Sequence, residues 1–327
     1  MKNSARRRSS RAKPSRARTS TLSAVVPARN YTVVGLGELL WDMLPGGKQL
    51  GGAPANFAYM TRLLGDQGVV ASRVGTDALG RLAARRLERL GLRSSHLQLD
   101  AVHPTGTVTV EVDADGQPTF EIAESVAWDF LEWTPAWQTL VEEVDAVCFG
   151  SLAQRSAQAR QTIRAFLQAV RPGTLRVFDV NLRQNFYSAQ TLSEGATLAD
   201  IIKLNSDELL AVVKTLGSPS YDETSAAQWL RRTYKTKLVC VTRGAKGSLL
   251  VGEDTTHEHP GCAVNVVDTV GSGDAFTAAL VYHYLRQAPL AVLNDAANRM
   301  GAWVASQSGA TPARDNSQLE KIRSVAG

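Results

Sequence analysis

The chain has 327 residues, of which 44% are hydrophobic and 20% charged, which suits one large α/β domain, or two small ones, with a sizeable core. Its net charge of +5 is misleading, because residues 1–29 hold nine Lys and Arg and no acid, which leaves −4 for the rest. Residues 30–327 therefore show no nucleic-acid footprint, and no apolar run approaches the roughly 18 residues of a membrane span.

The first 29 residues form a basic tail, rich in Arg and Ser, that lacks the hydrophobic segment of a secretory signal. The tail could be a disordered extension, an organelle transit peptide or a weak polyanion-binding arm, and the first is favoured because basic tails are common. Cys148, Cys240 and Cys262 lack CxxC spacing, which indicates unpaired thiols in a reducing compartment. We therefore expect a cytoplasmic protein, with organelle targeting by residues 1–29 left open.

After the tail, an apolar run over residues 31–38 ends in glycines and predicts the first strand of a parallel sheet. Gly35 and Gly37 lack a third glycine at the spacing of a dinucleotide-binding loop, which argues against a Rossmann domain. The next glycine pair, at residues 51–52, precedes a helix predicted over residues 57–64. Such a pair allows the backbone to approach a ligand closely.

Two polar side chains flank this glycine pair, Asp42 before it and Asn56 after it. Both could hydrogen-bond the hydroxyl groups of a ligand. The alternatives are a turn aspartate and a helix-capping asparagine. The residues alone leave both interpretations open.

A segment further on alternates with the period of two that is typical of strands. Residues 107–113 and 118–122, separated by a turn at Asp115-Gly116, predict a β-hairpin. Phe120 and Trp128 could line a ligand site beside it, and a place in the core or at the interface of the hairpin is equally compatible with each.

From residue 130 onward, strand and helix patterns alternate, as expected for a parallel sheet with crossover helices. In such sheets ligands bind in the loops that follow the strands. The predicted strands are residues 146–149, 176–179, 200–204 and 238–241, and the polar loops after them are residues 150–151, 179–183, 205–208 and 242–247.

Three of these loops hold candidate site residues. Arg183 could be a surface cation or a forked donor to a ligand. Asn205 and Glu208 lie one helical turn apart, which by spacing alone predicts a capping box. Residues 242–247 are by spacing alone a turn between strands, although their glycines would let the backbone approach a phosphate.

The most informative stretch is residues 264–280, where an apolar run breaks into a loop with Gly271 and Gly273 and then opens into a helix. The free N–H groups and the dipole at such a helix start suit an anion such as phosphate. Asp274 stands at this position. Taken alone it is a candidate N-cap, whereas beside a bound phosphate it could take a proton from a hydroxyl group.

These stretches resemble one family. Residues 268–274, Asp-Thr-Val-Gly-Ser-Gly-Asp, resemble the signature of the ribokinase-like (PfkB) carbohydrate kinases, with Ser272 in place of the commoner Ala. Residues 51–56, Gly-Gly-Ala-Pro-Ala-Asn, and residues 179–183, Asp-Val-Asn-Leu-Arg, are similar to the fructokinase branch, although Val180 replaces its usual Pro. Neither replacement removes a functional group.

The resemblance implies an α/β fold of the ribokinase type, a three-layer sandwich with a mostly parallel central sheet and a small β-lid. Residues 30–327 would form the kinase domain, with lid strands near residues 39–50 and 105–122 inserted, and residues 1–29 the tail. In the family the lid covers the sugar and excludes water, which would otherwise compete as the phosphoryl acceptor.

The implied activity is ATP-dependent transfer of the γ-phosphoryl group to a sugar hydroxyl, with fructose as the preferred substrate. The alternatives are a PfkB kinase for ribose, a nucleoside or a keto-deoxy sugar acid, and a non-catalytic PfkB-like protein. The implied cofactors are ATP and Mg²⁺, to which the resemblance adds K⁺. A sugar and ATP are thus the expected partners, and a homodimer through the lid edge follows from the resemblance alone.

The resemblance also assigns roles to individual residues. Asp274 would be the general base, beside an anion hole at Gly271, Ser272 and Gly273. The implied substrate-binding residues are Asp42, Gly51, Gly52, Asn56, Phe120 and Arg183. The implied nucleotide-binding residues are Asn205, Thr242, Gly244, Gly247 and Asn298. Glu208 would hold Mg²⁺ through water, and the residues implied for K⁺ are Asp268, Thr269, Ser306 and Gly309.

Overall fold

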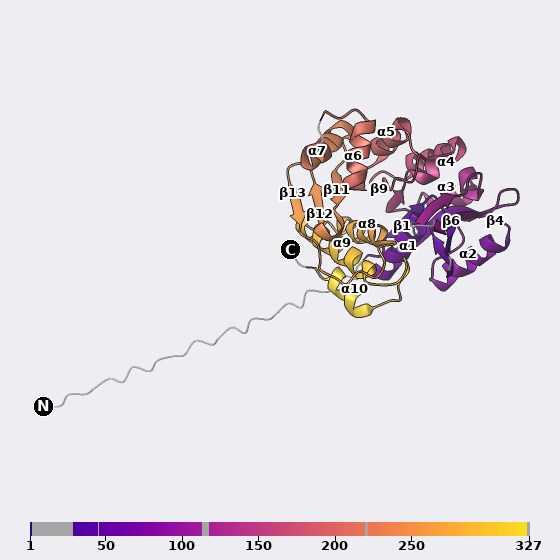
Figure 1. Ribbon diagram of the computed structural model, residues 1–327. Coiled ribbons are helices and arrows are strands. Elements are labelled where there is room, and N and C mark those ends of the chain that lie inside the picture. The colour runs from indigo at the N-terminus through magenta and orange to yellow at the C-terminus, as the bar shows by residue number, and fades with distance from the viewer. Residues whose placement is uncertain (2–28, 45, 113–117, 220–221, 326–327) are drawn as a thin grey trace.

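The computed structural model (Figure 1) describes residue 1 and residues 29–44, 46–112, 118–219 and 222–325. Residues 2–28 of the basic tail and the turn predicted at Asp115-Gly116 lie outside the described residues, so both expectations stay predictions. Within the described ranges, no helix combines the length and the apolar character needed to cross a bilayer.

The large sheet has nine strands in the described part of the chain, in the order β13-β12-β11-β10-β9-β8-β1-β4-β5. They are β1 (Thr32–Leu36), β4 (Gln67–Gly75), β5 (Leu97–Asp100), β8 (Ala146–Phe149), β9 (Leu175–Asp179), β10 (Ile201–Asn205), β11 (Leu238–Thr242), β12 (Ser248–Val251) and β13 (Thr256–His259). The strands from β11 to β5 are parallel, and β12 and β13 join antiparallel at one edge. The ends predicted for β8 to β11 were right to within one residue.

Helices cover both faces of this sheet (Figure 1). One face packs against α3 (Pro135–Leu140), α4 (Ala157–Ala169), α5 (Ala189–Leu198), α6 (Ser206–Thr215) and α7 (Glu223–Tyr234). The other packs against α1 (Ala53–Leu64), α2 (Ala78–Arg89), α8 (Ser272–Leu285), α9 (Leu290–Ala305) and α10 (Asn316–Arg323). Because side chains alternate along a strand, Phe178 enters the first core and its neighbour Val177 the second. The predicted three-layer α/β architecture is confirmed.

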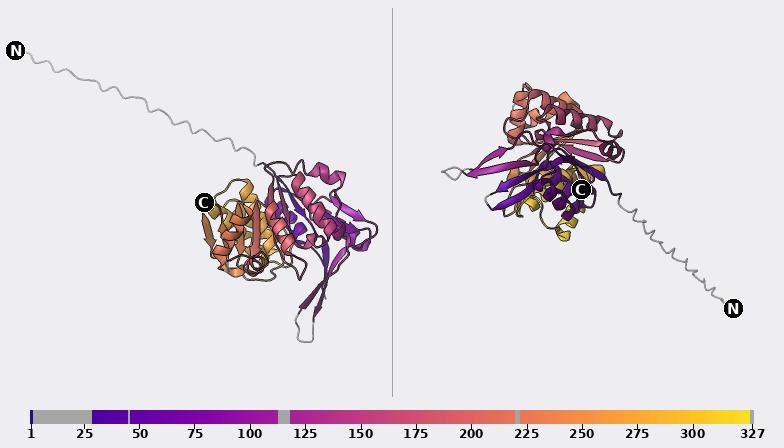
Figure 2. Two further views of the ribbon diagram at one scale, coloured as in Figure 1. Left: turned by 90° about the horizontal axis from the view of Figure 1, so that it is seen from above. Right: turned by 90° about the vertical axis from the view of Figure 1, so that its right-hand side faces the viewer.

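A small sheet has the strand order β3-β2-β6-β7. Its strands are β2 (Leu40–Leu44), β3 (Gly47–Gly51), β6 (Gly106–Val112) and β7 (Pro118–Ile122). Because β2 pairs parallel with β6, two segments far apart in the sequence form one sheet. The chain passes between this sheet and the body at residues 37–39, 52, 101–105 and 123–126. Figure 2 shows the strands extending away from the helix-covered body.

The apolar run before α8 belongs to neither sheet. Val264, Val266 and Val267 are 39%, 61% and 65% exposed, although their β-branched side chains are typical of a buried strand. The N–H group of Val267 donates to the carbonyl of Ala305, at the end of α9, over 2.9 Å. This contact ties the loop that leads into α8 to the end of the neighbouring helix.

Candidate active site

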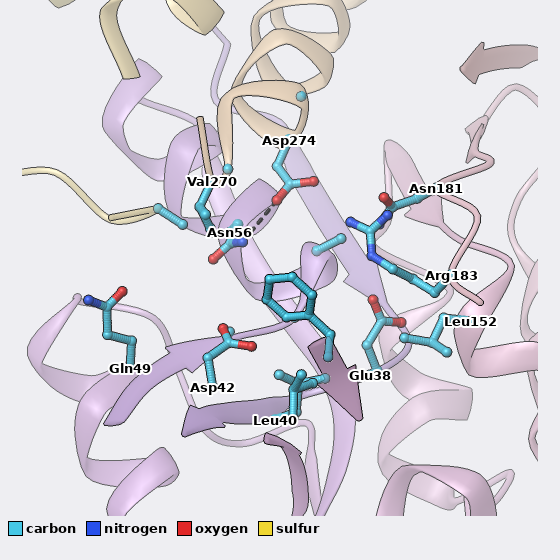
Figure 3. A pocket seen from close by; sticks show the side chains of 18 of the residues that line it. Glu38, Leu40, Asp42, Gln49, Asn56, Leu152, Asn181, Arg183, Val270 and Asp274 are labelled. Atoms are coloured by element: carbon cyan, nitrogen blue, oxygen red, sulfur yellow. Dashed lines mark hydrogen bonds between the residues drawn. The ribbon is translucent and has the colours of Figure 1, made fainter. Parts of the chain in front are cut away.

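A cavity of about 1000 Å³ lies between the small sheet and the end of the large sheet. Leu40, Asp42 and Phe120 of the small sheet line one wall, and the loop that begins α8 lines the opposite wall (Figure 3). The site therefore lies where ligands bind in open α/β sheets, beyond the carboxyl ends of the parallel strands.

Helix α8 begins at Gly271, in the wall of the cavity. Gly271 has a φ of 78°, and a Cβ atom there would lie 2.6 Å from the Cβ of Ala310. Both the left-handed backbone and the close neighbour therefore require glycine. Because Gly271 is the N-cap residue, Asp274 lies inside the first turn and is not the cap.

Several backbone N–H groups at this helix start are free. Among the described residues, no acceptor meets the N–H groups of Gly271, Gly273 and Asp274. The N–H of Ser272 differs, because it donates to the carbonyl of Thr269 over 3.2 Å. To take its predicted part in an anion hole, this N–H group would have to give up that hydrogen bond. Three free donors at the positive end of a helix suit a phosphate group.

The side chain of Asp274 points into the cavity, where Nδ2 of Asn56 donates to its Oδ2 over 2.9 Å (Figure 3). Removal from water and the nearby Asp179 raise the pKa of Asp274 to about 6, and Asn56, Lys203 and Arg183 oppose the rise. A carboxylate with this pKa is ionised at neutral pH and accepts a proton more readily than an ordinary aspartate.

A buried ion pair lies next to Asp274. Nζ of Lys203 lies 3.0 and 3.1 Å from the two carboxylate oxygens of Asp179, and Oγ1 of Thr277 donates to Asp179 over 2.9 Å. Lys203 is only 7% exposed and lines the cavity. A Cβ atom on Gly273 would come within 3.0 Å of its Nζ, which places this ammonium beside the start of α8.

Replacing either member of this pair should shift the pH dependence of turnover, in opposite directions. Lys203 lowers and Asp179 raises the pKa of Asp274, so Lys203→Met should move the acid limb of kcat to higher pH and Asp179→Asn to lower pH. Each variant should also lose roughly 3–5 kcal/mol of unfolding free energy, because it leaves a buried charge unpaired. Profiles of kcat against pH and unfolding in urea measure both effects.

The double variant, Lys203→Met with Asp179→Asn, should recover most of the unfolding free energy because neither charge of this pair is left behind without the other. Arg299→Met is the matched control, since it breaks an exposed pair with Asp295 and should cost under about 1 kcal/mol. Acid limbs that stay in place in both single variants would refute the electrostatic link to Asp274.

The glycine pair packs against two carboxyl-bearing residues. A Cβ atom on Gly51 would collide with Oδ2 of Asp42, and one on Gly52, whose φ is 107°, would lie 2.6 Å from the carbonyl oxygen of Glu38. Glycine at both positions therefore lets the carboxylate of Asp42 and the backbone carbonyl of Glu38 pack directly against the segment that enters α1. Burial raises the pKa of Asp42, and Arg183 opposes that rise.

Arg183 is an exposed cation that faces several acids. Its guanidinium lowers the pKa values of Glu38, Asp42 and Asp274, and all four residues line the cavity. Among the described residues, its Nη1 donates only to the carbonyl of Leu182, over 2.9 Å. Arg183 is therefore available to a ligand that enters between the carboxyl groups.

Phe120 and Trp128, which the sequence could not place, lie in different environments. Phe120 is 54% exposed and lines the cavity, whereas Trp128 is buried in the core. Nε2 of Gln184 donates to the carbonyl of Phe120 over 2.5 Å. This hydrogen bond joins the small sheet to the loop after β9 beside the cavity.

The other predicted residues, on the nucleotide side, do not line this cavity. Asn205 and Glu208 form the capping box that their spacing predicts: Oδ1 of Asn205 accepts from the N–H of Glu208 over 2.8 Å, and Oε2 of Glu208 accepts from the N–H of Asn205 over 2.9 Å. Oε1 of Glu208 accepts from the N–H of Leu182 over 2.9 Å. Each oxygen keeps a second lone pair, so this donor set fits a water-bridged Mg²⁺.

Asn298 is turned into the fold. It is 8% exposed, and its Nδ2 donates to Oγ of Ser248 over 2.7 Å and to the carbonyl of Asn294 over 2.8 Å. The resemblance implied that Asn298 lies by the adenine, and a contact through its amide nitrogen would have to break those bonds. Only the amide oxygen remains for a ligand.

The glycines after Thr242 differ in what surrounds them. Gly247 has a φ of 82°, and a Cβ atom there would collide with the carbonyl of His259. Gly244 has a φ of 58° and open space around that position. Gly247 thus packs the turn onto β13, and Gly244 is the one that leaves room for a ligand.

Asp268 connects the segments implied for K⁺. Its Oδ1 accepts from the N–H of Val270 and its Oδ2 from the N–H of Gly309, each over 3.0 Å. Its own N–H donates to the carbonyl of Ala305, the residue before Ser306, over 3.2 Å. The structure therefore brings these segments together, while the Asp268 carboxylate itself is held by backbone donors.

Sequence reasoning missed Glu38, Asp179 and Lys203 as site residues. A signal for Lys203 was present, because it interrupts an otherwise apolar buried strand. Glu38 lies two residues after the end of the first strand, where ligand-binding loops are expected. Asp179 opens the loop in which only Arg183 received a role.

Comparison of the sequence and the fold with known proteins finds similarity to carbohydrate kinases. The family described as pfkB family carbohydrate kinase matches residues 43–316. A fructokinase of Escherichia coli is 30% identical over 309 residues, which is 88% of this chain and 98% of that protein. A fructokinase of Vibrio cholerae O395, a double mutant solved with fructose, ADP and potassium ion, is 27% identical with a TM-score of 0.75, and covers 90% of this chain and 98% of its own.

An aminoimidazole riboside kinase of Salmonella enterica shares the fold, with a TM-score of 0.75 at 24% identity over 90% of this chain and all of that one. The chain belongs to the pfkB family of carbohydrate kinases. The fold class and the phosphotransferase activity on a sugar hydroxyl inferred from the sequence are thereby confirmed.

Proposed function

We propose that this carbohydrate kinase phosphorylates fructose, with ATP as the phosphoryl donor. The observation that carries the proposal is the placement of Asp274, a carboxylate with a pKa of about 6, beside three free backbone N–H groups in one cavity. A base for a hydroxyl proton and donors for phosphoryl oxygens are the two elements that direct phosphoryl transfer requires.

In the proposed reaction, Asp274 takes the proton of the attacking sugar hydroxyl. The N–H groups of Gly271 and Gly273 hold oxygens of the transferring phosphoryl group, and Lys203 keeps a positive charge beside them. Bound Mg²⁺ would offset the charge of the ATP phosphates, with Glu208 holding it through water. The small sheet excludes water from the acceptor position.

The charges of the cavity support a neutral sugar. Glu38, Asp42 and Asp274 face one exposed cation, Arg183, across the space that a substrate would enter. An anionic sugar acid or sugar phosphate would be repelled by the ionised carboxylates, whereas a neutral polyol can donate hydroxyl hydrogens to them. Fructose-phosphorylating relatives over most of the chain support the choice among neutral sugars.

The test is ADP release with ATP, Mg²⁺ and K⁺ across fructose, ribose, adenosine, fructose 1-phosphate and keto-deoxygluconate. We expect fructose turnover well above the others, and a requirement for K⁺ would support the site around Asp268. Faster turnover of another compound would make that compound the substrate in place of fructose and would leave the assignment as a kinase unchanged. No turnover with ATP still bound would favour a non-catalytic role. The proposed homodimer, through edge strands β3 or β7 of the small sheet, is tested by sedimentation.

A further inference from the structure

One carboxyl group of the cavity has no assigned role. Glu38 lies between β1 and β2, is 3% exposed, and lines the cavity. Its Oε2 is fully enclosed and has no hydrogen-bond partner among the described residues. Buried polar atoms in folded proteins are almost always paired, so an unpaired one that lines a ligand cavity indicates a group that the ligand or its water satisfies.

The surroundings of Glu38 keep it in place. Its carbonyl oxygen packs against Gly52, and its carboxyl group stands near Arg183, as Figure 3 shows. The backbone N–H groups of Glu38 itself and of Ala53 interact with the carboxyl group and partly offset the effect of burial on its pKa. None of these contacts satisfies Oε2, and an ion pair with Arg183 does not form in this structure.

We infer that Glu38 is a sugar-binding residue, whose carboxyl group hydrogen-bonds one particular hydroxyl of the substrate. The inference rests on the proposed function, since it supposes a polyol in this cavity, and it adds a determinant of which hydroxyl pattern is accepted. Burial raises the pKa of Glu38 to about 7, so near neutral pH the group both donates and accepts. A sugar hydroxyl also does both, which makes the two complementary.

The test compares Glu38→Gln with the unmodified chain. Gln keeps the shape, but its NH₂ group replaces one carboxyl oxygen and can only donate, so at that position it no longer accepts a hydrogen bond from a sugar hydroxyl. We expect the sugar KM to rise roughly tenfold, the value for one lost hydrogen bond of moderate strength, while the ATP KM stays within about twofold. Glu38→Asp, which withdraws the carboxyl group by one methylene, should give a similar rise and guards against a folding defect specific to Gln.

Thr61→Val is the matched control. Oγ1 of Thr61 is also buried and has no hydrogen-bond partner in the described part of the chain, but Thr61 lies on α1 and does not line the cavity. The control should leave both KM values unchanged, because removing a buried unpaired atom matters for sugar binding only where the sugar meets it. An equal rise of the sugar KM in Thr61→Val would overturn the inference.

A substrate series identifies the hydroxyl. Binding of fructose, ribose and adenosine is measured by calorimetry, independently of turnover, and repeated with each monodeoxy derivative of the tightest binder. Removing the hydroxyl that contacts Glu38 should weaken sugar binding to the unmodified chain roughly tenfold. The same removal should hardly change sugar binding to the Glu38→Gln variant. The difference between these two effects is the coupling that a double-mutant cycle measures. Coupling should be absent at the other hydroxyls.

The outcomes separate the two proposals. In the first outcome, the unmodified chain turns over a sugar, but Glu38→Gln binds that sugar as tightly as the unmodified chain or no hydroxyl shows coupling. This outcome would overturn the role of Glu38 and leave the kinase proposal standing. Sugar binding without turnover, lost in Glu38→Gln, would keep Glu38 and overturn the kinase proposal. A chain that binds none of the three probes overturns both.

Discussion

Replacing Asp274 with Asn is expected to lower kcat by roughly 10²–10⁴-fold, the range for loss of a general base. Sugar and ATP dissociation constants should change by less than about threefold, because the amide has the size of the carboxylate and can still meet Asn56. Rapid-quench turnover and calorimetric binding measure the two effects. Asp315→Asn is the control: this exposed N-cap of α10 works equally well as Asn.

The pH profile provides a second measurement of the same assignment. Asp274 must be ionised to accept a proton, and its pKa is raised to about 6, so kcat of the unmodified enzyme should fall as pH drops through about 6. That limb should disappear from the residual activity of Asp274→Asn. Turnover close to that of the unmodified enzyme, or an unchanged acid limb in the variant, would refute the assignment of Asp274 as the base.

The same variant should be more stable than the parent at neutral pH. A carboxyl group whose pKa is raised on folding favours the folded state most below its unfolded pKa, near 3.8, and loses that contribution as pH rises through about 6. Above pH 6 the folded chain therefore carries a buried charge that Asn lacks. We expect Asp274→Asn to have the higher Tm at pH 8 and no such advantage at pH 4.

The second large effect is expected from Gly271→Ala. The new Cβ atom would lie 2.6 Å from the Cβ of Ala310 and would occupy a backbone with a φ of 78°. Either the loop or α8 must move, and the free N–H groups would no longer converge. Turnover should fall roughly 10²–10³-fold, as when a donor to a developing anion is lost. Steady-state kinetics and thermal unfolding measure the change.

Gly173→Ala separates the local clash from the general cost of a left-handed residue. Gly173 has a φ of 90°, but apart from its two chain neighbours no atom of the described residues lies within 4 Å of the position a Cβ would take. Both variants should lose about 1–2 kcal/mol of stability from the backbone alone, and only Gly271→Ala should lose turnover. Equal turnover in the two variants would show that the start of α8 does not serve as an anion site.

Much of the fold was readable from the sequence because its signals are local. Buried parallel strands are short apolar runs, and β8 to β11 each stand between polar loops, so their ends could be placed closely. The turn at Gly271 was readable for the same reason, since a left-handed glycine before a helix is encoded within a few residues.

The parts that were missed depend on register between distant segments. Lys203 and Asp179 are direct neighbours on adjacent parallel strands, a relation that neither segment reveals alone. The role of Asn298 beside the adenine stays a prediction, and the sequence did not reveal that Ser248 and Asn294 accept hydrogen bonds from its amide. For Glu208, local spacing alone predicted the contact that is seen, with the N–H of Asn205.

Four chain passages join the small sheet to the body, at residues 37–39, 52, 101–105 and 123–126. The pairing directions of β2, β3, β6 and β7 place all four passages at the same end of the small sheet. Glu38 lies in one of these passages, whereas Asp42 and Phe120 lie within the strands beyond them. Any tilt of the small sheet relative to the body would therefore displace Asp42 and Phe120 more than Glu38.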